Sequence, residues 1–121
     1  MGAGVIISLP MPPSANNLFV TDKRTFKRFP APAYKAWKKR AADALGRYAA
    51  LPQLEKPYGV HIRLNLNHQG DIANREKACC DALVSAGIIV GDQWINTLRI
   101  DRDRTVSECE VEIWSLAGEG A

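Results

Sequence analysis

Three carboxylates lie in or beside one predicted helix near the middle of the chain. Asp71 precedes this helix, Asp81 lies within it and Asp92 follows it. Hard divalent cations prefer oxygen ligands, and such a cation can assist phosphate chemistry. If the chain turns back after the helix, the loop carboxylates on its two sides can converge. We therefore predict that Asp71 and Asp92 bind Mg²⁺, with Mn²⁺ as an alternative ion and Asp81 as a further ligand.

The central helix is predicted over residues 70–87. A glycine and a carboxylate at its start, and Gly87 at its end, are typical of helix boundaries. At about 100° per residue, one face is apolar and the opposite face is polar. The apolar face has Ile72, Cys79, Leu83 and Ala86, and the polar face has Asn74, Lys77, Asp81 and Ser85. Lys77 is placed to hold a phosphate oxygen. The alternative interpretation is a solvated face with an i,i+4 ion pair between Lys77 and Asp81.

The residues of this region and of the N-terminus follow two recognisable motifs. The first motif consists of Asp71, Asn74, Lys77, Asp81, Leu83, Gly87 and Asp92. The second is the segment Leu-Pro-Met-Pro-Pro-Ser-Ala-Asn at positions 9–16. Together they resemble the RusA family of Holliday-junction resolvases, small metal-dependent DNA endonucleases that prophages often carry. The spacing and the order of elements agree with that family over nearly the whole chain.

The resemblance implies a Mg²⁺-dependent, structure-selective DNA endonuclease that resolves four-way junctions by phosphodiester hydrolysis in DNA recombination and repair. It implies that Asp71, Lys77 and Asp92 are catalytic, with Lys77 stabilising charge on the phosphate. Asn74 would belong to the DNA-binding residues and orient Asp71 or a metal-bound water. Asn16 would lie near the active site and contact DNA. A homodimer is also implied, because symmetric cutting of a junction needs two active sites.

Two positions depart from the family pattern. Ala73 stands where the family usually has its second aspartate, and Gly91 stands where it has the first aspartate of a later pair. The first departure removes an expected metal ligand. Three hypotheses therefore remain: an active junction-cutting nuclease, a catalytically impaired protein that binds branched DNA, and a structural or regulatory phage protein with no role on DNA.

A basic stretch precedes the central helix. Between Lys23 and Arg40 the chain has eight basic residues and no acidic one. Such a stretch is typical of a phosphate-binding surface, although a solvated basic face explains the charge equally well. The residues predicted to bind DNA here are Lys23, Arg24, Lys27 and Arg28. By contrast, Glu108, Glu110 and Glu112 predict an acidic outer face on the last strand.

Three phenylalanines, Phe19, Phe26 and Phe29, are interleaved with these cations in a loop over residues 18–32, which we expect to contain a flap or short hairpin. Aromatic and basic residues together suit contact with unstacked or distorted DNA. The same side chains can instead pack beneath the loop or across a dimer interface. We favour packing.

The periodicity predicts an α+β fold with the order β-α-β-α-β-β. The expected strands cover residues 4–9, 58–67, 98–102 and 109–113, and the expected helices cover 33–50 and 70–87. Both helices would pack on one mixed β-sheet, as in a RusA-like dimeric protein. Residues 1–121 would then form a single RusA-like endonuclease domain.

The composition is compatible with this reading. A hydrophobic content of 46% is ordinary for a globular protein. No apolar run is long enough to span a membrane, and residues 1–9 lack the features of a signal peptide, so we expect a cytoplasmic protein. Cys79, Cys80 and Cys109 show no metal-ligand spacing and are predicted to be reduced thiols, without a zinc site.

Overall fold

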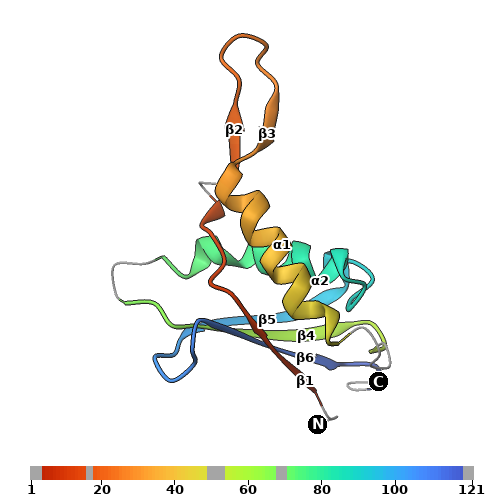
Figure 1. The fold of residues 1–121 in the computed structure, drawn as a ribbon. Coiled ribbons are helices and arrows are strands. Elements are labelled where there is room, and N and C mark those ends of the chain that lie inside the picture. The colour runs from red at the N-terminus through yellow and green to blue at the C-terminus, as the bar shows by residue number, and fades with distance from the viewer. Residues whose placement is uncertain (1–3, 16–17, 49–53, 68–70, 119–121) are drawn as a thin grey trace.

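The computed structural model describes residues 4–15, 18–48, 54–67 and 71–118. Two helices cover one face of a mixed four-stranded sheet, and a two-stranded hairpin projects away from the body (Figure 1). The sheet contains the strands β1 (Val5–Leu9), β4 (Tyr58–Leu64), β5 (Ile95–Arg102) and β6 (Cys109–Ser115). The hairpin contains β2 (Phe19–Thr21) and β3 (Arg28–Pro30). The helices are α1 (Pro32–Gly46) and α2 (Glu76–Ser85), and the 3₁₀ turns η2 (Ala73–Arg75) and η3 (Asp92–Trp94) flank α2. The predicted α+β class and the order of the main elements are therefore confirmed.

Strand β4 lies in the middle of the sheet, whose strand order is β1-β6-β4-β5. It pairs antiparallel with β6 and parallel with β5. Its side chains Val60, Ile62 and Leu64 are fully buried in a core that also contains Trp37 and Leu45 of α1. Two parallel neighbours need a crossover connection, and α2 provides it. The segments before and after α2 consequently lie towards opposite ends of that helix.

Both helices are shorter than the sequence predicts. Helix α1 begins at Pro32, where the missing proline N–H is not needed, and it ends at Gly46 rather than continuing towards residue 50. Helix α2 begins at Glu76 rather than at residue 70, because a side-chain turn and η2 precede it. The predicted burial of Cys79 and Leu83 is confirmed, whereas Ala86, at the C-cap of α2, is exposed.

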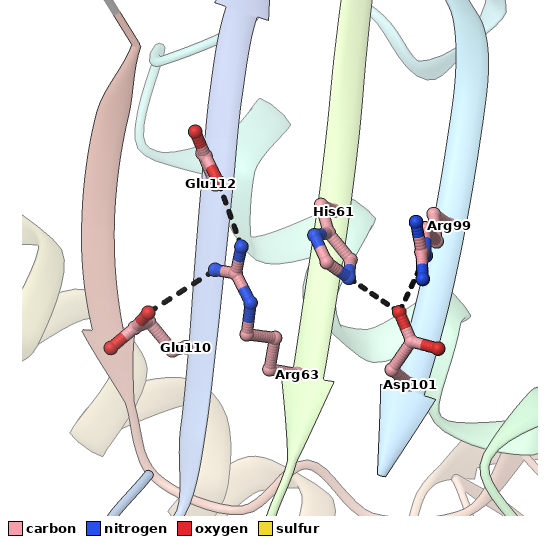
Figure 2. A network of polar contacts seen from close by, with 6 residues as sticks. All are labelled: His61, Arg63, Arg99, Asp101, Glu110 and Glu112. Atoms are coloured by element: carbon pink, nitrogen blue, oxygen red, sulfur yellow. Dashed lines mark hydrogen bonds and ion pairs between the residues drawn. The ribbon is translucent and has the colours of Figure 1, made fainter. Parts of the chain in front are cut away.

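The face of the sheet opposite the helices carries a network of charged side chains (Figure 2). Arg63 Nη1 lies 3.2 Å from Glu110 Oε1, and its Nη2 lies 2.9 Å from Glu112 Oε1. His61 Nε2 lies 2.6 Å from Asp101 Oδ2. Hydrogen bonds from His61 and then from Arg99 lower the pKa of the Asp101 carboxyl. The predicted acidic outer face of β6 is thus partly neutralised by Arg63 of β4.

Position 59 has room only for glycine, because the indole ring of Trp114 lies directly over it on β4. A Cβ atom at position 59 would overlap the Trp114 ring. We expect Gly59→Ala to lower the free energy of unfolding by about 1–3 kcal/mol, because the ring must shift out of its place on the sheet. Urea unfolding followed by circular dichroism measures the change.

The matched control is Gly46→Ala at the end of α1, where a Cβ atom meets nothing within 4 Å. Alanine favours a helix over glycine by up to about 1 kcal/mol, so this variant should be as stable as the wild type or more so. Equal stability of the two variants would show that the Trp114 contact does not constrain position 59.

Candidate active site

A surface hollow of about 440 Å³ lies between α1, α2 and the segment that follows α2. Asp81 of α2 and Asp92 of η3 both line it, together with Tyr34 and Lys38 of α1. The structure therefore brings together two of the three carboxylates singled out in the sequence. Asp71 does not line this hollow.

The turn at Gly87 explains how Asp92 reaches Asp81. Gly87 has φ +75°, a left-handed conformation that glycine adopts readily, and the N–H of Ile88 donates to the Leu83 carbonyl at 3.0 Å. The predicted helix stop at Gly87 is therefore confirmed. Ile89 is 1% exposed and anchors the returning chain in the core.

Asp81 receives two polar contacts on the same oxygen. The Tyr34 hydroxyl donates to Asp81 Oδ2 at 3.5 Å, and Lys77 Nζ lies 3.5 Å from that atom. Burial, and then the charge of Asp81 and this hydrogen bond, raise the pKa of Tyr34, so its hydroxyl stays protonated at neutral pH. The i,i+4 ion pair of the alternative interpretation is thus present. It is half-exposed, and such pairs are weak enough for Lys77 to exchange Asp81 for a phosphate.

Asp71 takes part in a separate local arrangement before α2. Its Oδ1 accepts the N–H of Ala73 at 2.9 Å, and its Oδ2 accepts Asn74 Nδ2 at 2.8 Å. The hydrogen bond by which Asn74 was expected to orient Asp71 therefore exists. Ala73 is exposed and has no carboxylate to add. These contacts hold the Asp71 carboxylate in place at the start of α2.

The proline-rich N-terminal segment packs against the same region. Arg75 Nη1 donates to the Pro12 carbonyl at 2.7 Å, and Trp37 Nε1 donates to the Pro10 carbonyl at 3.0 Å. The second motif thus lies between α1 and the turn that holds Asp71. Asn16, its last residue, lies outside the described residues.

A metal ion fits the hollow only if water or substrate oxygens complete its coordination shell. No cluster of three histidine, cysteine, aspartate or glutamate residues suited to a metal occurs in the described ranges. Mg²⁺ usually takes only one or two protein carboxylates and completes its shell with water and substrate phosphates. Asp81 and Asp92 supply that number. Within the described residues, the Asp92 carboxylate forms no hydrogen bond or ion pair, so it can bind an ion without losing a partner.

Cys80 is buried beside these carboxylates but does not join their chemistry. Burial, and then the nearby Glu76, Asp92 and Asp81, raise the pKa of its thiol well above the usual value. A protonated thiol is a poor metal ligand and nucleophile. The structure also shows Cys79 and Cys109 as free and buried, as predicted.

The residues predicted to bind DNA on the basic stretch lie on the hairpin. Lys23, Arg24, Lys27 and Arg28 are all exposed. The hairpin extends beyond the N-terminal end of α1, away from the sheet (Figure 1). Its turn is closed by hydrogen bonds from Asp22 N–H to the Lys27 carbonyl and from Phe26 N–H to the Asp22 carbonyl.

The three phenylalanines of this region behave differently from one another. Phe19 packs edge-on against Tyr34, with ring centroids 5.9 Å apart, as the packing interpretation requires. Phe26 has φ +58° at the hairpin tip and is 81% exposed, and Phe29 is 44% exposed. Packing beneath the loop is therefore wrong for Phe26, and packing of Phe26 across a dimer interface stays a prediction.

Tyr34 and Lys38 are site-lining residues that the sequence analysis did not select. The available signal was their spacing of four residues, which places an aromatic ring and a cation on the same helix face.

The comparison with known families identifies the family of the chain. The family model described as Endodeoxyribonuclease RusA matches residues 10–114. The chain belongs to the RusA family. No curated protein matches it.

The RusA match covers the first motif, residues 10–16 of the second, and every candidate site residue from Asn16 to Asp92. RusA proteins are endodeoxyribonucleases, so a purely structural role without DNA is the least supported hypothesis. Among the described residues, neither helix combines the length and apolar character of a membrane-spanning segment.

Asp92 should contribute to divalent-cation binding. We expect Asp92→Asn to weaken Mn²⁺ binding by about tenfold or more, because the hollow then keeps only one anionic ligand. Electron paramagnetic resonance of free Mn²⁺ measures the affinity. Asp43→Asn, on the exposed face of α1 and outside the hollow, removes the same charge and should leave binding unchanged. Identical affinities of the two variants would exclude Asp92 as a ligand.

Proposed function

We propose that this RusA-family protein is a metal-dependent endonuclease that resolves four-way DNA junctions by phosphodiester hydrolysis. The observation that supports this most is the meeting of Asp81 and Asp92 in one hollow beside Lys77. Ala73 and Gly91 favour a second candidate function, a catalytically impaired protein that binds branched DNA. The two candidates differ only in whether strands are cut.

In the nuclease, Asp92 and Asp81 would hold Mg²⁺ or Mn²⁺, and the family pattern adds Asp71. When bound, the ion would supply Lewis-acid activation of the phosphodiester and of the attacking water. Lys77 moves from Asp81 to the phosphate and stabilises the charge that develops there. Asn74 keeps Asp71 in one orientation through its hydrogen bond.

The hairpin cations Lys23, Arg24, Lys27 and Arg28 would contact the DNA backbone, and Asn16 would bind DNA near the active site. The exposed Phe26 lies among these cations, where an aromatic ring can stack on an unpaired base. A homodimer would place two such hairpins and two active sites around a four-way junction. Residues 1–121 would act as one domain in the cytoplasm.

Cleavage of a labelled four-way junction distinguishes nuclease from binder. We expect Ala73→Asp to raise the Mg²⁺-dependent rate by on the order of 10²-fold or more, because an added carboxylate near Asp71 supplies a further metal ligand. The exposed position accepts the larger side chain.

The control for this experiment is Asp92→Asn in the same Ala73→Asp chain, which should abolish cutting and retain junction binding. Cutting by the unmodified chain supports the active nuclease. Cutting only after Ala73→Asp supports the impaired binder. A chain that neither cuts nor binds junctions in any of these forms contradicts both candidates.

The hairpin should determine the salt dependence of junction binding. We expect the double variant Lys23→Ala with Arg24→Ala to lower the slope of log affinity against log salt by about 1–2, since each phosphate contact contributes roughly 0.9. Fluorescence anisotropy at several salt concentrations measures this slope. Lys56→Ala with Arg104→Ala removes the same charge from exposed positions elsewhere and should keep the slope. Equal slopes for the two double variants would show that Lys23 and Arg24 do not contact the DNA backbone.

A further inference from the structure

Two adjoining hollows form one groove between α1 and α2. Their volumes are about 370 and 440 Å³, and both are lined by Tyr34, Lys38, Asp81 and Ser85. Lys38 is the α1 cation that borders both. The neighbouring α1 cations Lys35 and Lys39 line neither hollow.

The ammonium group of Lys38 rests on an aromatic ring. Its Nζ lies 4.9 Å from the centroid of the Tyr34 ring. That ring is held firmly, since Tyr34 is 2% exposed and packs against Phe19 and Trp37. A cation–π contact positions an ammonium group without using its N–H donors on an acceptor oxygen.

Lys38 differs in this respect from Lys77 of α2, which lines neither hollow. Lys77 is paired with Asp81, whereas Lys38 forms no ion pair within the described part of the chain, although two carboxylates line the same hollow. Its positive charge is therefore available to an anion that enters the groove. A DNA strand is the polyanion that a RusA-family protein binds.

We infer that Lys38 is a phosphate-binding residue that contacts a phosphodiester oxygen of a DNA strand in the groove between α1 and α2. The inference rests on the proposed function, because it takes DNA as the ligand of this site. It adds α1 to the surface that binds the strand and gives Tyr34 a role as the platform beneath the ammonium group.

The test measures binding of a labelled four-way junction by the full chain in Ca²⁺. Fluorescence anisotropy gives the affinity at each of several salt concentrations. We expect Lys38→Ala and Lys38→Gln to weaken binding by about fivefold to tenfold and to lower the salt slope by about one, as for the loss of one phosphate contact. Lys39→Ala removes the same charge from the next residue and should keep the slope. Thermal unfolding should be alike in all three variants, because both lysines are exposed.

The outcomes separate this inference from the proposed function. If the wild-type chain binds junctions and the Lys38 variants match Lys39→Ala, Lys38 does not contact phosphate and only the inference is overturned. If the wild-type chain neither binds nor cuts junctions, the proposed function fails and the inference fails with it. A loss of slope confined to the Lys38 variants supports the contact.

Discussion

Burial of the central strand constrains the rest of this protein. Strand β4 is paired on both sides, and Val60, Ile62 and Leu64 on its inner face are fully buried. A slip of one residue would turn these side chains outward and bring His61 and Arg63 into the core, which is costly. The strands on either side, and the helix that connects β4 to β5, are placed by this register.

The parallel pairing of β4 with β5 also decides which carboxylates meet. Helix α2 is the crossover between the two strands, so Asp71 lies before it and Asp92 after it. The left-handed turn at Gly87 and the burial of Ile89 bring the chain back along α2, where Asp92 joins Asp81. Asp71 lies before α2, in the turn that leads into η2, and lines neither hollow. The candidate site is thus organised by strands that line neither hollow.

The two faces of the sheet have different roles. The inner face is buried against α1 and α2, which contribute residues to the candidate site. The outer face is covered by ion pairs in which Arg63 neutralises Glu110 and Glu112 (Figure 2). Partly exposed ion pairs of this kind contribute modestly to stability individually, but they prevent repulsion along β6. The basic hairpin stands apart from both faces, and its cations are exposed (Figure 1).

By itself, the sequence determined the α+β class, the order of the main elements, the stop at Gly87 and the RusA family, because these depend on periodicity, local turn chemistry and motif spacing. It did not determine the start of α2, since the Asp71 side chain competes with the helix for nearby N–H groups. Nor did it show that Phe26 lies in solvent, or that Tyr34 and Lys38 line the same hollow as Asp81. Asp81 is far from Tyr34 and Lys38 in the chain, and only the packing of α1 against α2 above a buried strand brings the three residues to one hollow.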